Sequence, residues 1–566
     1  MERSKKYTAR RILAFILCAA LLCGGLFIPV LADEAAESRK PSRGRQILYD
    51  IGDTLLVGFL KGIAAVMPIK LPKTYETGLD FYLGMEAFLD EPAEGARWSL
   101  GYARASVIPG GWFDPVTKEY IGPEGVFVGG SPKGEDPLRP IIDDKVPTRL
   151  IDDMCVRVTA LSDGSGRGAA VFAQLDTYAI TSYDIRIIRA WLREFAEENN
   201  LVSINIGMLH QHSSIDTFGY NGPLLKSLFL NPFINLLPEK WRRPLYTGKS
   251  PAYMEFLYEV MAEAVMEAVG NMEPGALYYG SASAEEWIYD RRPPYIMDEE
   301  MHRLRFVPDK EDARETWMLN LGVHHVGLDG DSQRISGDAP YYAEERVNEI
   351  YDANFQLIVG GQLGIHKRYT PIEDGTERGQ IETMMAWGYA LADYIAGVDN
   401  EEEVEPLLNI RHAEYRVPVD NPLHLLILRS GATQFTAVKR RFGPTRLDIV
   451  TETGYMELGG SLAVGFGPGE IDPILYLGGA SPAAESYTGK DYPFTPMKDM
   501  ARGDAATGGS RKFLMFSLMN DRSLYYLLPN DFQNFVRFGN EEINCMSALA
   551  GPRLLEAFEA LTDSVK

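Results

Sequence analysis

The hydrophobic pattern is most regular between residues 168 and 210. The segment 168–176, "GAAVFAQLD", is a short apolar run with the length of a buried strand. In 182–200, "SYDIRIIRAWLREFAEENN", apolar residues recur at the spacing of a helix, and 201–210, "LVSINIGMLH", is a second apolar run. The pattern therefore predicts a strand, a helix and a second strand that is parallel to the first.

The second strand of this unit ends in a pair of histidines, His210 and His212. Parallel sheets bind ligands just beyond the carboxyl ends of their strands. Because side chains alternate along a strand with a period of two, both imidazoles are expected on one side. The chain has only 8 histidines among 566 residues, and neutral imidazole suits zinc, copper or iron. The spacing alone leaves two readings open, a metal site or two histidines held by loop hydrogen bonds, because zinc needs three or four ligands.

Two further apolar runs also end in histidine. "WMLNLGVHH" ends in His324 and His325, and "FQLIVGGQLGIH" ends in His366. If these runs are strands of one sheet, their histidines converge at one edge, and otherwise they are separate loop residues. Later in the chain, Glu470 follows the strand-like "GGSLAVGFGPG". This carboxylate is either a ligand or general base, or a helix N-terminal residue favoured by the helix dipole.

The first residues of the chain have the layout of a targeting segment. "MERSKKYTARR" is basic, residues 12–31 are continuously apolar, and "VLA" precedes "DEAAES". This layout predicts a signal peptide cleaved after Ala32. The apolar run is also long enough to remain as a membrane anchor. Either reading predicts a secreted or cell-envelope protein that is extracytoplasmic.

The remaining pattern divides the chain into three parts. Residues 1–32 are the signal peptide or anchor, and residues 33–80 are a polar tether followed by a first helix in the apolar stretch 51–72. Residues 81–566 are one α/β catalytic domain with an insertion around 221–250. Its first portion, 82–150, is rich in glycine, proline and aromatic residues, which favours short strands and long ordered loops.

Composition and charge exclude several classes of function. The formal net charge is −23, and removing residues 1–32 removes five basic residues and one acidic residue, which gives −27. Such an acidic body is not a nucleic-acid binder. Cys155 and Cys545 remain after cleavage, and the sequence does not decide whether they pair. The motifs HExxH, GxSxG, GxxxxGK[ST] and CxxC are absent from the sequence.

Taken in order, five segments between about residues 80 and 560 resemble the neutral/alkaline, non-lysosomal ceramidase family. These enzymes are zinc-dependent amidases that cleave the N-acyl bond of ceramide. "MLHQHSS" resembles the family's His-Thr-His-Ser segment, and "IYDRRPPY" resembles its Asn-Arg-Ser-Pro segment. "LNLGVHHVGL", followed by "RISGD", resembles a Phe-x-Val-His segment followed by Ser-Gly-Asp. "LAVGFGPGE" resembles Leu-Ala-Ile-Val-x-x-Pro-Gly-Glu, and "NDRSLYYLL" resembles Asn-x-Tyr-x-x-Tyr-hydrophobic.

The resemblance implies a specific site and fold. One zinc ion per chain would be held by His210, His324, Glu470 and Tyr525. His212 and Arg291 would be the catalytic residues of a hydrolase that uses a metal-bound water. The implied substrate is an N-acylated, lipid-like amide such as ceramide. The expected fold is a mixed, partly parallel sheet with helices and long ordered loops, without the C-terminal immunoglobulin-like domain of the family.

The chain also departs from the family pattern. The family's Gly-Asp-x-Ser-Pro-Asn segment aligns with "GIHKRYTP", so that Lys367 stands where an active-site serine is expected, beside His366. Residues 221–246 form an apolar insertion, which is either a lid or lip that contacts a lipid surface or an extra helix that covers the core. Two alternatives to the amidase therefore stay open. One is an envelope binding or scaffold protein that keeps the fold without catalysis, and the other is a metal-dependent esterase.

Overall fold

The computed structural model describes residues 43–67, 81–130, 145–241, 243–328, 333–369, 376–439, 447–479, 482–484, 486, 488–504, 508–530, 532 and 541–566. A large sheet has the strand order β13-β11-β10-β8-β1-β4-β5-β6, with β15 beside β8. Its strands are β1 (Trp98–Ser106), β4 (Cys155–Ser162), β5 (Ala169–Leu175), β6 (Leu201–Met208), β8 (Glu273–Ser283), β10 (Glu300–Pro308), β11 (Glu315–Leu321), β13 (Ala353–Val359) and β15 (Glu402–Val404). The end pairs β5–β6 and β11–β13 are parallel, and the pairs between them are antiparallel. The predicted mixed, partly parallel α/β sheet is confirmed.

The predicted strand–helix–strand unit is present as β5, α4 (Ser182–Trp191), α5 (Arg193–Glu198) and β6. All seven residues of β5 are buried because both faces of this part of the sheet are covered. The reason given for the direction of His210 is wrong, however. β6 ends at Met208, and His210 has a φ of 63°, so the alternation of the strand does not continue to this residue.

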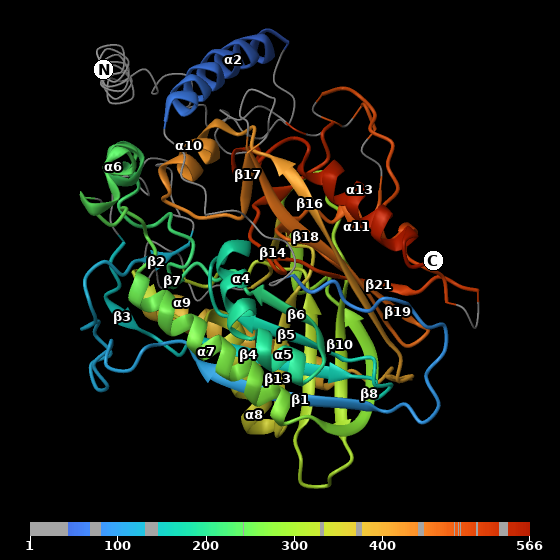
Figure 1. Cartoon of the computed structure of the whole chain (residues 1–566). Coiled ribbons are helices and arrows are strands. Elements are labelled where there is room, and N and C mark those ends of the chain that lie inside the picture. Colours follow the sequence, from blue (N-terminus) through green and yellow to red (C-terminus); the bar gives the residue numbers. More distant parts are fainter. Residues whose placement is uncertain are drawn as a thin grey trace, which may run out of the picture.

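A second sheet packs on the first and gives the domain four layers (Figure 1). It contains β16 (Leu408–Pro418), β17 (Ala437–Lys439), β18 (Leu447–Leu458), β19 (Leu462–Phe466) and β21 (Lys512–Phe516). Between the sheets, the ring of Phe172 contacts those of Phe466 and Phe516. α4 and α7 (Pro251–Gly270) cover the outer face of the large sheet, and α13 (Ala550–Asp563) covers that of the second. The apolar residues of both sheets are therefore buried on two sides.

The remaining elements surround these layers. The longer helices are α2 (Arg43–Val66), α6 (Leu224–Leu236), α8 (Asp338–Ile350), α9 (Glu377–Ala396) and α10 (Pro422–Ser430), and the short ones are η1 (Glu239–Trp241), α11 (Ile474–Leu477), α12 (Met497–Met500) and η3 (Glu541–Asn544). Four short strand pairs are β2 (Val128–Gly129) with β7 (Ser214–Ile215), β3 (Arg149–Leu150) with β12 (Arg334–Ile335), β9 (Ile288–Asp290) with β14 (Ile365–Lys367), and β20 (Glu470–Ile471) with β22 (Tyr525–Tyr526).

Two features bear on the N-terminal prediction and on the cysteines. α2 lies in the region where a first helix was expected, although it begins earlier, at Arg43, and it packs against α10. Among the described residues, no helix has the length and apolar character needed to cross a membrane, and residues 12–31 lie outside them. Cys155 and Cys545 are both buried free thiols, so they do not form a disulfide with each other.

Candidate metal centre

The three apolar runs that end in histidine are β6, β11 and the β13–β14 segment. β6 and β13 lie at opposite ends of the strand order, but the sheet curls so that its ends approach each other. The side chain of Gln356, on β13, donates hydrogen bonds to the backbone carbonyls of Arg157 on β4 and Phe172 on β5. This curling brings the segments that carry His210 and His324 together, which was one of the two alternatives left open by the sequence.

Two histidines and a glutamate meet at this point. His210 Nε2 lies 3.2 Å from Glu470 Oε1, and His324 Nε2 lies 2.9 Å from Glu470 Oε2. All three side chains are buried, and their three ligand atoms lie within 4.8 Å of one another. The structure therefore brings together three of the four residues that were expected to bind zinc.

The hydrogen bonds of the two imidazoles fit a metal ion. His210 Nδ1 lies 2.7 Å from the carbonyl oxygen of Tyr178, and His324 Nδ1 lies 2.9 Å from that of Ile365. A carbonyl only accepts, so Nδ1 carries the proton and a neutral ring turns the Nε2 lone pair towards Glu470. An ionised carboxylate also only accepts, so a cation is needed between these atoms. Burial lowers the pKa of His210 and disfavours an added proton, whereas a divalent metal satisfies both lone pairs and the carboxylate.

Arg522 is a member of this cluster that sequence reasoning missed. Its Nη2 donates a hydrogen bond to Glu470 Oε1, and its side chain is only 2% exposed. Burial by itself raises the pKa of Glu470, but its surroundings, which include the Arg522 charge, outweigh burial and hold that pKa well below its usual range. The available signal was its position three residues before Tyr525, inside a segment already used for the resemblance.

Tyr525, the expected fourth ligand, lies beside Glu470. β20 and β22 are parallel, and Glu470 and Tyr525 are paired in their register. Neighbouring strands lie about 4.8 Å apart, so the two residues are adjacent. Tyr525 is partly buried, and its ring centre lies 5.3 Å from the Arg522 guanidinium. Its role as a ligand stays a prediction.

His212 stands next to the cluster as the pair pattern predicted. Its ring centre lies 5.0 Å from that of His210 and 6.4 Å from that of His324. Burial lowers the pKa of His212 well below its usual range, so the ring is neutral at pH 7. No described residue forms a hydrogen bond with its buried Nε2. His212 is therefore a neutral base with a lone pair beside the candidate metal ligands.

Gln211, between the two histidines, fixes the turn that carries them. Its Nε2 donates to Asp176 Oδ1 at 2.8 Å and to the carbonyl of Gly337 at 3.2 Å. Asp176 also accepts a hydrogen bond from Arg157 at 2.9 Å. Asp176, directly after β5, therefore holds the turn that carries His210 and His212 through its hydrogen bond with Gln211.

The structure separates Arg291 from its neighbour Arg292. Arg291 is exposed, and its backbone N–H donates to the carbonyl of Gly364. Arg292 is half-buried, and its Nη1 lies 2.7 Å from Asp472 Oδ2, two residues beyond Glu470. A catalytic role for Arg291 remains a prediction.

His366 and Lys367, which depart from the family pattern, lie close to the cluster. The ring of His366 stacks on that of His324 with centres 5.1 Å apart. Lys367 is buried, and its Nζ lies 3.8 Å from Asp338 Oδ1. The Asp338 carboxylate accepts backbone N–H bonds from Gly327 and Ala339, which gives the Ser-Gly-Asp motif a structural role.

His325 points to a different part of the fold. It is fully buried, its ring lies 6.1 Å from that of Trp387 on α9, and no described residue forms a hydrogen bond with either ring nitrogen.

Comparison with solved structures places this geometry in a known fold. No family model and no curated protein matches the sequence. The chain is similar to the neutral ceramidase from Pseudomonas aeruginosa, with a TM-score of 0.56 and 12% identity over 83% of this chain and 75% of that one. It is also similar to a ceramidase complexed with C2, with a TM-score of 0.54 and 14% identity over 82% and 74%. The chain therefore has the fold of the neutral ceramidases, as the sequence motifs predicted.

Proposed function

We propose that the protein is a metal-dependent hydrolase that cleaves the amide bond of an N-acylated, lipid-like substrate such as ceramide. The observation that carries this proposal is the convergence of His210, His324 and Glu470, whose buried ligand atoms lie within 4.8 Å of one another. Nitrogen and carboxylate donors suit zinc, and we propose one zinc ion per chain with Tyr525 as the fourth ligand. Export out of the cytoplasm is part of the same proposal.

Each residue of the cluster has a distinct part in this chemistry. Zinc, when bound, polarises a carbonyl group and lowers the pKa of water towards neutrality. The carbonyls of Tyr178 and Ile365 fix the tautomer of the two histidine ligands. His212, neutral and with Nε2 unpartnered among the described residues, accepts a proton from water and returns it to the leaving amine. We assign Arg291, at the surface, to stabilising negative charge on the substrate.

One observation favours a second candidate, a binding protein that keeps the fold without catalysis. Lys367 is buried near Asp338 at the position where the family pattern has serine. A metal-dependent esterase would use the same residues on a different bond.

One experiment separates these candidates. The purified protein is analysed for metal and incubated with zinc and a panel of ceramides, N-acyl amino acids, N-acyl amines and matched esters. The proposal expects about one zinc per chain and amide cleavage that stops with a chelator and in His210→Ala. Zinc binding without any product favours the binding protein, and cleavage of esters alone favours the esterase. Absence of zinc, with His210→Ala unchanged in every property, contradicts the metal site.

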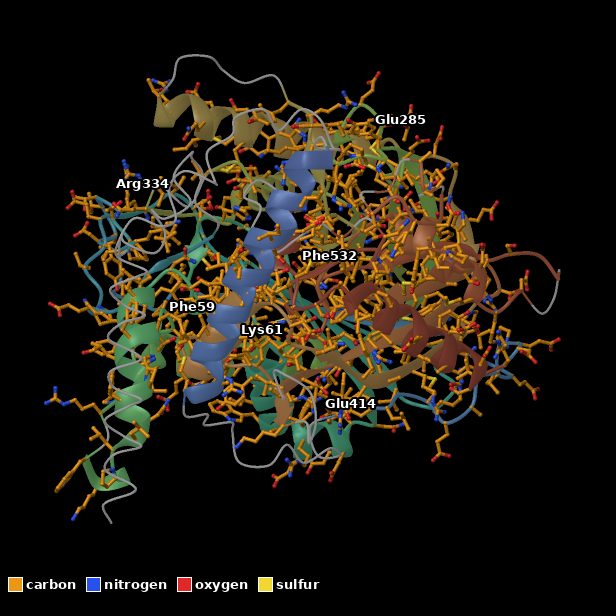
Figure 2. All side chains as sticks on the ribbon, turned by 90° about the horizontal axis from the view of Figure 1, so that it is seen from above. Phe59, Lys61, Glu285, Arg334, Glu414 and Phe532 are labelled. Carbon is orange, nitrogen blue, oxygen red and sulfur yellow. The ribbon has the colours of Figure 1, made fainter. Side chains whose placement is uncertain are left out.

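An enzyme with a lipid-like substrate also needs a surface that contacts the membrane holding that substrate. α6, from the predicted insertion, exposes Leu230, Phe233 and Leu236. α2 exposes Ile47, Ile51, Leu55 and Phe59 at a spacing of four, and among its described exposed side chains Asp50 alone is charged. Both helices pack against α10 (Figure 1), and Figure 2 shows Phe59 on α2 at the surface.

We propose that α2 and α6 rest on a lipid bilayer. The apolar run 12–31 ends 11 residues before α2, and this tether reaches at most about 40 Å, so an anchored chain holds α2 near the membrane. The full-length protein is reconstituted into phosphatidylcholine vesicles that contain a photoreactive phosphatidylcholine. Peptides of α2 and α6 are expected to be labelled, whereas the exposed apolar residues Val116 and Ile121, between β1 and β2, are not. Equal labelling of all three regions contradicts the proposal.

A further inference from the structure

The guanidinium of Arg522 has more donors than its protein partners use. Its Nη2 donates to Glu470, while no described residue forms a hydrogen bond with its buried Nε and Nη1. The side chain is 2% exposed, so bulk water does not solvate these groups freely. Leaving a buried donor unpaired is unfavourable, and more so on a charged group. The N–H groups on these two nitrogens therefore favour a ligand that brings an acceptor.

Aromatic rings hold the guanidinium in place beside the metal centre. Its central carbon lies 5.8 Å from the ring centre of Tyr178 and 5.3 Å from that of Tyr525. The ring of Tyr178 in turn stacks on that of His210, with centres 4.7 Å apart. Aromatic faces attract the cation but do not replace a hydrogen-bond acceptor. Arg522 is therefore pre-positioned next to a candidate zinc ligand.

The net charge of the cluster favours an acceptor that carries a negative charge. Arg522 and Glu470 cancel, and the two imidazoles are neutral when they bind a metal. A divalent ion would then leave net positive charge in a buried space, because a Tyr525 phenolate would balance one charge at most, and burial makes unbalanced charge costly. A substrate with a negative group next to its amide is favoured over a neutral one.

We propose that Arg522 binds a carboxylate on the amine side of the substrate, so that N-acyl amino acids are preferred over neutral amides such as ceramide. This inference rests on the proposed hydrolase. In an N-acylglycine, one carbon separates the amide nitrogen from the carboxylate. When the amide lies at the metal centre, its carboxylate can therefore reach Arg522, which is hydrogen-bonded to Glu470. Nη2 carries a second N–H, and a parallel pair of donors for the two oxygens of a carboxylate is formed by this group together with Nη1 or Nε.

The test uses two amides that differ in one group. N-dodecanoylglycine and N-dodecanoylethanolamine share the acyl chain and the amide, and they end in a carboxylate and a hydroxymethyl group. We expect the zinc-loaded protein to prefer the glycine conjugate in kcat/KM by at least about tenfold, because hydrogen bonds to charged groups contribute about 1.5–3 kcal/mol. In Arg522→Gln this preference falls to about one, and Arg522→Lys keeps part of it.

A binding measurement gives a readout that does not depend on activity. Calorimetry with the zinc-free protein is expected to show tighter binding of the glycine conjugate, and Arg522→Gln removes the difference. Arg292→Gln, which changes a guanidinium paired with Asp472 instead, is the matched control and keeps the difference. Zinc content and thermal midpoint are measured for every variant to exclude unfolding.

The outcomes separate this inference from the proposed function. If both amides are cleaved with zinc but without preference, or if Arg522→Gln keeps the preference, the inference is wrong and the hydrolase stands. If neither amide is cleaved and no zinc binds, the proposed function is wrong. In that case the calorimetric ratio still decides the inference, and equal affinities for the two amides overturn it.

Discussion

Two sites in this fold hold buried histidines with different hydrogen-bond partners. On α10, His424 Nδ1 lies 2.5 Å from the hydroxyl of Tyr220, and its Nε2 lies 3.0 Å from the carbonyl of Ile543. A hydroxyl can donate and a carbonyl accepts, so one neutral tautomer satisfies both nitrogens. Burial accordingly lowers the pKa of His424 to about 3. This histidine needs no further ligand.

The histidines at the candidate metal centre differ in their partners rather than in their burial. His210 and His324 each face a carbonyl with Nδ1 and the Glu470 carboxylate with Nε2. No neutral tautomer satisfies two acceptors at once. The comparison teaches that a pair of acceptors on both sides of a buried imidazole distinguishes a metal candidate from a structural histidine.

The largest expected difference between the two sites appears in zinc affinity when one histidine is removed from each. His210→Ala or His324→Ala is expected to lower zinc affinity by about 10²- to 10³-fold, because zinc binding of about 10–16 kcal/mol is shared among about four ligands. His424→Ala keeps its zinc although it loses two hydrogen bonds. Competition with a chelating dye measures the affinities, and equal zinc binding by all three variants would falsify the distinction.

Glu470→Gln tests the carboxylate in the same way. It leaves the Arg522 charge without its partner, and breaking a buried pair costs about 3 kcal/mol or more. The matched control is Glu452→Gln, which breaks the buried pair of Glu452 with Arg189, whose atoms lie 2.8 Å apart. Urea unfolding is expected to show similar destabilisation for the two variants, but only Glu470→Gln loses zinc. Loss of zinc from both would mean that metal binding reports general stability.

The sequence predicted the parts of this site that depend on local pattern. The β5–α4–β6 unit could be read directly because its strands and helices are contiguous and regular. The proximity of His210 and His212 was also predicted, although the turn at His210, rather than strand alternation, produces it.

Convergence over long distances needed more than local pattern. His210, His324 and Glu470 are separated by more than a hundred residues each, so only the order of family-like segments brought them together in advance. Arg522 could not be found because a buried charge is recognisable only from its partner in space. Arg291 and Arg292 are adjacent in the sequence, and the structure distinguishes them by the exposure of Arg291 and by the ion pair of Arg292 with Asp472.

The two kinds of histidine are also expected to differ in how much added zinc stabilises the variants that lack them. Zinc that binds only the folded chain stabilises it by about 2.7 kcal/mol at a free concentration of 100 times Kd. The wild type and His424→Ala are both expected to gain this amount, whereas His324→Ala gains none. Thermal unfolding with and without zinc measures the gain, and an equal rise in His324→Ala would indicate binding at another place.

A histidine that burial keeps neutral is expected to make the free energy of unfolding depend on pH. Burial lowers the pKa of His412, whose Nε2 lies 2.8 Å from Ser203 Oγ, to about 4, against about 6.5 in an unfolded chain. Between these values the unfolded state binds the extra proton, so this contribution to stability is complete above pH 6.5 and is lost as the pH falls towards 4.

At pH 5 the free energy of unfolding is expected to be about 2 kcal/mol lower because of His412. This pH lies about 1.5 units below 6.5, and each unit corresponds to about 1.4 kcal/mol. His412→Gln has no proton to bind. The destabilisation that it causes, measured by urea unfolding against the wild type, is therefore expected to be about 2 kcal/mol smaller at pH 5 than at pH 7. Because the difference is taken between two chains, the shared carboxyl groups cancel. An equal difference at both pH values would show that folded His412 accepts a proton and is not kept neutral by burial.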